Sequence, residues 1–76
     1  MTELLEYLAK SLVEHPEDVQ VTRIDGEKSI ILELRVAEDD MSKVIGRQGR
    51  IAKAIRSVVR AAAAKEDKHV IVEIVQ

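Results

Sequence analysis

The sequence predicts an α+β fold in which three helices lie on one face of a three-stranded mixed sheet. Three observations lead to this prediction. Apolar residues recur at helical spacing in residues 3–14 and 51–64. They alternate with polar residues in 19–36 and again in 69–75. An Asp-Gly dipeptide divides the first alternating stretch into two strands. The element order is therefore α-β-β-α-α-β, in a single small domain over residues 1–76.

The first helix is expected over residues 3–14, where five apolar residues share one face: Leu4, Leu5, Leu8, Ala9 and Leu12. Thr2 is its expected N-cap, and Pro16 ends the pattern. Tyr7 is the chain's single aromatic residue. Its place on this helix predicts a partly buried packing residue rather than a platform for base stacking.

Two strands should follow as a hairpin, with Asp25-Gly26 as its two-residue turn. Asp39 or Asp40 is the expected cap of a short helix that ends at Ile45. A glycine turn, a long helix to about residue 64 and a final strand over 69–75 complete the chain. Because two helices connect the second strand to the third, these strands should be parallel, with the second strand in the middle.

Charge is segregated along the chain although the formal net charge is only −2. Residues 1–42 hold 11 acidic and 4 basic side chains, and residues 66–76 hold 3 and 1. Residues 43–65 hold no carboxylate and seven cations: Lys43, Arg47, Arg50, Lys53, Arg56, Arg60 and Lys65. An ordinary solvated helix face would alternate opposite charges. This stretch therefore indicates a local cationic field suited to an anionic partner.

The run Val44-Ile45-Gly46-Arg47-Gln48-Gly49-Arg50-Ile51 lies at the start of that stretch. Glycine permits a foreign backbone to approach where a Cβ would collide. The first N–H groups of the following helix, with the positive end of its dipole behind them, favour an anion at the same place. The pattern predicts a phosphate clasp for a nucleic-acid backbone.

Several classes of function lack the residues they need. The chain has no cysteine, and its two histidines, His15 and His69, stand apart in the sequence. Asp39 and Asp40 are better explained as a helix cap than as an acid–base pair. We therefore expect no enzyme, metal site or cofactor. The absence of a long apolar run leads us to expect a cytoplasmic protein that does not enter the membrane.

The residues from Val44 to Ile55 resemble the V-I-G-x-x-G-x-x-I-x-x-I core of the KH domain. They depart from it at one point, because Ile51 comes one residue early and Ala52 stands in its place. The element order matches the type II KH arrangement. With Asp-Asp-Met-Ser-Lys before the motif and Ala-Ile-Arg within it, nearly the whole chain is similar to the bacterial KhpA (YlqC-type) family of RNA-binding proteins.

This resemblance implies that about four nucleotides of single-stranded RNA lie across the Gly46–Gly49 turn, in a groove beside the last strand. It also implies a post-transcriptional or RNA-chaperone role linked to cell division, cell shape and cell-wall homeostasis. The expected RNA-binding residues are Lys43, Val44, Ile45, Gly46, Arg47, Gln48, Gly49, Arg50, Ala52 and Lys53.

The apolar members of this set have two interpretations. Val44, Ile45 and Ile51 either line the groove under a base or pack into the core, and for Ile51 the core is favoured. Ala52 is small enough for a base to lie over it. Backbone groups around Val70 to Val72, at an open strand edge, are the one source of base preference that the sequence suggests.

The long helix has an apolar arc of roughly 200°, wider than one buried stripe needs. We expect an association surface that includes Ala52, Val58, Val59 and Ala63. The alternative is that alanine is simply a good helix former at the surface. The family resemblance implies a homodimer, and also a heterodimer with a larger KhpB (Jag)-type KH protein.

Two other functions remain open at this point. One is a protein-interaction module that keeps the KH fold without binding RNA. The other is a helix-turn-helix DNA binder, because two helices joined through a glycine-bearing turn also begin that module. A helix-turn-helix rarely follows a hairpin or precedes a strand, and its turn does not need two glycines.

Overall fold

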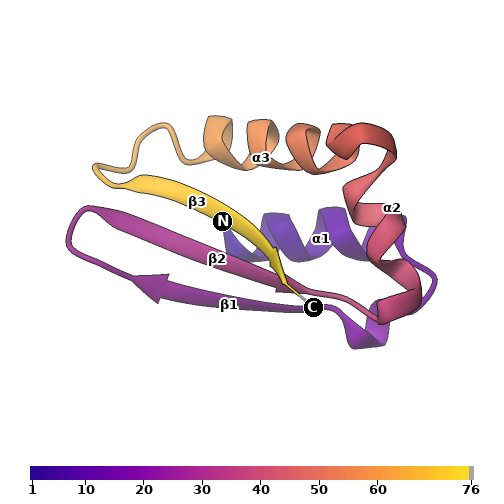
Figure 1. Cartoon of the computed structure of the whole chain (residues 1–76). Helices are drawn as coiled ribbons and strands as arrows, with labels where there is room; N and C mark the ends of the chain where they lie inside the picture. The colour runs from indigo at the N-terminus through magenta and orange to yellow at the C-terminus, as the bar shows by residue number, and fades with distance from the viewer. Residues whose placement is uncertain (76) are drawn as a thin grey trace.

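The computed structural model describes residues 1–75 and has the predicted element order (Figure 1). Its helices and strands are α1 (Thr2–Leu12), β1 (Gln20–Asp25), β2 (Ser29–Arg35), α2 (Met41–Ile45), α3 (Arg50–Ala62) and β3 (His69–Val75). Short 3-10 turns precede β1 (η1, Pro16–Asp18), α2 (η2, Glu38–Asp40) and α3 (η3, Arg47–Gly49).

The sheet has the order β1-β2-β3, which confirms that the second strand is central. Strands β1 and β2 are antiparallel, whereas β2 and β3 are parallel, with Leu32 beside Val72. The predicted mixed sheet is therefore confirmed. Within residues 1–75, β3 pairs with β2 alone, which leaves its other edge open.

The hairpin turn lies two residues later than predicted. The N–H of Gly26 donates to the carbonyl of Ser29 at 2.8 Å, so the tip is Glu27-Lys28 rather than Asp25-Gly26. Asp25, which the prediction placed in the turn, pairs with Ile30 at the end of the β1–β2 ladder. The two registers differ by an even number of residues and turn the same side chains inward. Alternation of apolar residues alone cannot distinguish them.

The core lies between the sheet and the helices, with α1 and α3 over one face of the sheet and α2 at its end (Figure 1). The buried side chains of the sheet alternate along β2 and β3, as expected. Helix residues complete the core, and the buried cluster includes Leu5, Ala9, Ile30, Leu32, Leu34, Val44, Ile55, Val59, Val70 and Val72. No helix within residues 1–75 is long and apolar enough to cross a bilayer.

Two details of the helix ends differ from the predictions. Thr2 is the first residue of α1, Met1 is the N-cap, and no side chain caps this end. The last helix stops at Ala62, and the residues that follow form a turn in which the N–H of Ala64 donates to the carbonyl of Ala61. Alanine has a high helix propensity, so composition alone suggested a longer helix.

Candidate nucleic-acid interface

The predicted glycine motif forms a tight turn between α2 and α3. Gly46, Gln48 and Gly49 have φ values of 75°, 58° and 74°. The N–H of Gly46 donates to the carbonyl of Ser42 at 2.9 Å. The N–H of Gly49 donates to the carbonyl of Gly46 at 3.2 Å. The side chains of Arg47 and Gln48 are exposed at the tip. The backbone of this turn is held by its own hydrogen bonds while its tip faces solvent.

The two glycines are needed for different reasons. A Cβ on Gly46 would come within 2.6 Å of Ile51 Cγ1, so the chain itself fills the space beside this residue. A Cβ on Gly49 would meet nothing within 4 Å, and only its positive φ favours glycine there. The expectation that both glycines make room for a foreign backbone is therefore wrong for Gly46, because Ile51 occupies that room.

Hydrogen-bond donors converge at this turn. The exposed side chain of Arg47 lies at its tip. Helix α3 begins here without a side-chain cap, so the positive end of its dipole is uncovered. Arg50 lies beside the tip, and its Nη2 donates to Gln48 Oε1 at 3.3 Å. The tip thus offers donors and positive charge to an anion.

Lys43, which the sequence placed in the RNA-binding set, is engaged within the fold. Its Nζ lies 3.1 Å from Glu14 Oε1 and 3.4 Å from Asp40 Oδ1. Hydrogen bonds to Glu14 and then to Asp40 raise its pKa, against the effect of desolvation. The two carboxylates offset the positive potential of this ammonium group, so Lys43 attracts a phosphate less than an unpaired lysine would. The sequence did not show this because Glu14 is far away along the chain.

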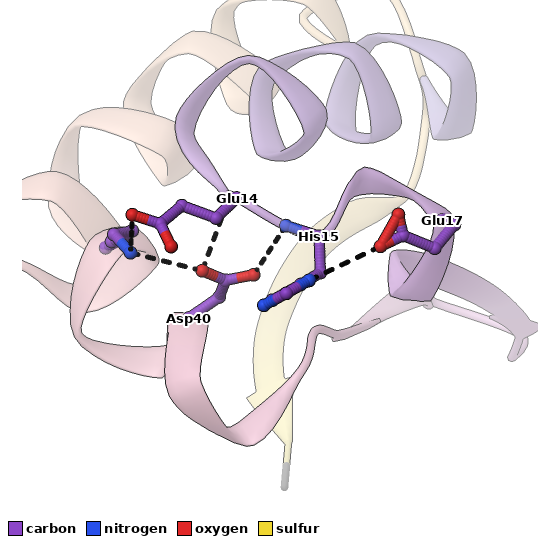
Figure 2. A network of polar contacts seen from close by, with 5 residues as sticks. Glu14, His15, Glu17 and Asp40 are labelled. Atoms are coloured by element: carbon purple, nitrogen blue, oxygen red, sulfur yellow. Dashed lines mark hydrogen bonds and ion pairs between the residues drawn. The ribbon is translucent and has the colours of Figure 1, made fainter.

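Asp40 occupies the N-cap position of α2, as predicted, but its side chain makes no capping hydrogen bond and is instead a buried anchor (Figure 2). Its carboxylate accepts the N–H groups of Glu14 at 3.1 Å and of His15 at 3.0 Å. Burial alone would raise the pKa of Asp40, but these two donors and Lys43 outweigh it and hold that pKa below its usual value. Asp40 thereby ties the segment after α1 to the start of α2, the helix that leads into the glycine turn.

The apolar residues of the predicted set divide between core and surface. Val44 is 0% exposed and Ala52 is 4% exposed, so neither offers its side chain to a base. Both expectations of groove contact are corrected, because these side chains face the interior of the domain. Ile45 is exposed beside the turn, and Ile51 is half-buried and packs against the core, as favoured.

The basic side of α3 faces β3 and includes two residues that the predicted set omitted. Arg56 Nε donates to the carbonyl oxygen of Val72 at 3.1 Å. Arg60 lines a hollow of about 230 Å³ with Lys68, His69 and other residues near the start of β3. The available signal was helical spacing, since Lys53, Arg56 and Arg60 share one side of α3.

The opposite side of α3 forms an apolar groove with α1, of about 450 Å³. Three of the residues that line it are large, apolar and exposed: Tyr7 (70% exposed), Leu12 (40%) and Val58 (45%). The prediction that Tyr7 is partly buried is wrong, because its ring stands at the rim of this groove. The groove is separate from the hollow beside Arg60, and the two have no lining residue in common.

The expected association surface on α3 is largely buried. Ala52, Val59 and Ala63 are 4%, 0% and 6% exposed, so the edge of the helix that we expected to be uncovered is the edge that packs on the domain. These three side chains are not available to a partner. Val58, on the groove side, is the one member of that set that remains exposed.

Comparison with known proteins identifies close relatives. The family model described as KhpA/KhpB, KH domain, matches residues 2–74. A Clostridium acetobutylicum protein named RNA-binding protein KhpA is 65% identical over 75 residues, covering 99% of this chain and 100% of the relative. The protein of the same name from Clostridium perfringens is 67% identical with the same coverage. That from Listeria monocytogenes is 47% identical over 76 residues, covering 100% of both chains.

Solved structures support the fold. The chain is similar to part of Era in its complex with MgGDPNP and nucleotides 1506–1542 of 16S ribosomal RNA, with a TM-score of 0.66 and 21% identity. A GDP·AlF4⁻ complex of an Aquifex aeolicus Era variant gives a TM-score of 0.64 and 20% identity. Each match covers 96% of this chain and 28% of the Era chain.

Proposed function

This chain belongs to the KhpA/KhpB family of KH domains, and from that premise we propose that it binds single-stranded RNA across the Gly46–Gly49 turn. One observation carries the proposal. The tip of this turn offers the uncapped start of α3 and the exposed Arg47 and Arg50, with no carboxylate among residues 43–65. Phosphate oxygens are suited to such a site.

The RNA continues from this turn along the basic side of α3, between that helix and the open edge of β3. Lys53, Arg56 and Arg60 follow one another along this side. The path ends at the hollow beside the loop between α3 and β3. As in other KH domains, we propose about four nucleotides for this length. The role is one of binding rather than catalysis, in post-transcriptional regulation or RNA chaperoning.

The double change Arg47→Asp and Gln48→Asp tests the site. Both side chains are exposed, so the fold should persist, whereas two anions at the tip should oppose phosphate and reduce RNA affinity at least a hundredfold. Binding is measured by fluorescence anisotropy with a labelled single-stranded RNA at several salt concentrations. For the unmodified protein, three phosphate contacts by Arg47, Arg50 and Lys53 give a slope of log K against log salt of about −2.

A matched control separates local from global charge effects. The exposed Lys28 and Gln20 lie on the hairpin, so Lys28→Asp with Gln20→Asp makes the same change of net charge away from the turn. This variant should lose much less RNA affinity than the turn variant, because neither position belongs to the Gly46–Gly49 turn, although the carbonyl of Lys28 accepts the N–H of His69 beside the far end of the path. Equal loss in both variants, or a slope near zero, contradicts the proposal.

We also propose that a second copy of the chain covers the apolar groove between α1 and α3. Tyr7, Leu12 and Val58 are exposed together on this face, and exposed apolar side chains that cluster favour a protein partner. Arg50 is the basic residue of α3 that lines the groove, and α1 carries Glu3 and Glu6 as well as Lys10, which lies 3.9 Å from Glu6. In a two-fold dimer, α1 of one copy would face α3 of the other and bring these acidic residues towards Arg50.

A further inference from the structure

Arg56 spans the space between α3 and the open edge of the sheet. Its side chain is partly buried, and its Nε donates to the carbonyl oxygen of Val72 on β3 at 3.1 Å. β3 is an edge strand, and backbone groups along such an edge are the sites that an added chain or base would use. At Val72, Arg56 already occupies the acceptor, so a base placed there meets the guanidinium first.

The contact with Val72 fixes how the guanidinium is presented. An arginine carries five N–H donors in a planar fork, and Nε uses one of them here. Within residues 1–75, no carboxylate forms an ion pair with Arg56. The four N–H donors on the two Nη atoms are therefore left to a ligand, on a group whose orientation the strand already holds.

Arg56 also stands midway along the proposed RNA path. The glycine turn ends at Gly49, just before α3, and the hollow lined by Arg60 lies one turn beyond Arg56. The turn supplies phosphate contacts at one end. A residue at the middle of the path, next to the strand edge, is placed to meet a base rather than the first phosphates.

A fork with both Nη atoms free matches two adjacent acceptors. Guanine offers O6 and N7, and cytosine offers O2 and N3, whereas adenine and uracil place a donor next to each acceptor. We propose that Arg56 is a specificity-determining residue that selects cytosine or guanine at the nucleotide beside β3. This inference rests on the proposed function, because it concerns which bases the RNA site accepts.

The test compares four labelled RNA octamers: octacytidine, octauridine, alternating U-G and alternating U-A. The affinity for octacytidine should exceed that for octauridine by about tenfold, or the affinity for U-G should exceed that for U-A by about tenfold. A difference of this size is expected from one bidentate contact. Arg56→Lys keeps the charge but loses the fork. It should reduce the preference to less than about twofold, mainly by weakening the binding of the favoured octamers.

Arg60→Lys is the matched control, because it makes the same change one turn further along the same side of α3 and should keep the preference. A second measurement uses the unmodified protein. Replacing guanine by 7-deazaguanine, or cytosine by 3-deazacytosine, removes one of the two acceptors. The affinity for the modified octamer should then fall to that for the disfavoured octamer. This measurement does not depend on whether Arg56→Lys folds.

The outcomes separate this inference from the proposed function. Equal binding of all four octamers would overturn selection by Arg56 and leave RNA binding in place. A preference that survives Arg56→Lys would also overturn it. An equal loss of affinity for all four octamers in Arg56→Lys would overturn it as well, because a phosphate contact has that effect. Failure to bind any octamer would overturn both.

Discussion

At the scale of the residue, Gly46 has a conformation that side chains cannot share. Its φ of 75° and ψ of 175° lie in a region that is almost exclusive to glycine, and Ile51 fills the position of the missing Cβ. Gly49, with φ 74° and ψ 15°, is left-handed helical, which other residues reach at moderate cost. Gly46 therefore has the more stringent requirement of the two.

We expect Gly46→Ala to lower the free energy of unfolding by about 3 kcal/mol, because it combines backbone strain with a collision against Ile51. Gly49→Ala is the matched control and should cost only about 1–2 kcal/mol, since it introduces strain without a collision. Urea denaturation followed by circular dichroism measures both. Equal losses for the two variants would show that the contact with Ile51 does not matter.

At the scale of the element, the short helix α2 is held in place from outside itself. It has five residues, too few to be stable alone, and no side chain caps it. The carboxylate of Asp40 accepts the N–H groups of Glu14 and His15, and Lys43 bridges back to Glu14 (Figure 2). These contacts fix α2 against the segment after α1, so they also fix where the glycine turn begins.

Asp40 should make stability depend on pH. Its folded-state pKa is lowered, so its contribution is complete above the unfolded value of about 3.9 and is lost as the pH falls through the folded-state value. Asp40→Asn should therefore be less stable than the unmodified protein at pH 7, and the gap should shrink below about pH 4. Denaturation curves from pH 7 to pH 3 measure it.

Asp39→Asn is the control for this pH series. Asp39 is exposed and adjacent in sequence, so its replacement should change stability at pH 7 by less than about 0.5 kcal/mol. A stability gap for Asp40→Asn that stayed constant with pH would assign its effect to shape rather than to charge. No gap at all would show that the anchor is not needed.

At the scale of the whole molecule, α3 separates two surfaces of different chemistry. Its basic side faces β3 and the proposed RNA path, and its apolar side forms the groove with α1. A dimer through the groove would leave the β3 side of α3 uncovered in both copies, although Arg50 lines the groove as well as flanking the turn. Two linked sites raise the effective concentration for one strand, so association should strengthen RNA binding without new contacts to it.

Val58→Asp tests this arrangement, because Val58 is exposed in the groove and its replacement perturbs the core little. We expect a folded monomer with weaker binding to RNAs long enough to reach both sites. Sedimentation velocity measures the association. Ser57→Asp, an exposed neighbour outside the groove lining, should remain dimeric. An unmodified chain that stays monomeric at high micromolar concentration would contradict the homodimer and favour a KhpB-type partner for the groove.

The local patterns of the sequence determined the elements of the fold and the turn. The periods of 3.6 and 2 residues separated helices from strands, and the connection through two helices required a parallel β2–β3 pair. The glycines and the charge segregation located the turn at 46–49. These features depend on neighbouring residues, so a single sequence contains them.

Tertiary structure decided what each side chain contacts. It engaged Lys43 with Glu14, directed the carboxylate of the N-cap residue Asp40 to Glu14 and His15, and buried Ala52, Val59 and Ala63. These outcomes depend on residues far apart in the chain, and periodicity does not encode which side of a helix meets which neighbour.

The same limit explains the hairpin register and Arg56. Both possible registers turn the same apolar residues inward, so alternation of apolar residues does not distinguish them, and only the folded hairpin shows which one forms. The bond from Arg56 to Val72 joins a helix to a strand 16 residues later, and it forms only because β3 returns beside β2. The sequence determined which residues can carry this chemistry, whereas the folded chain decided which of them are free to do so, because long-range contacts set burial and charge pairing.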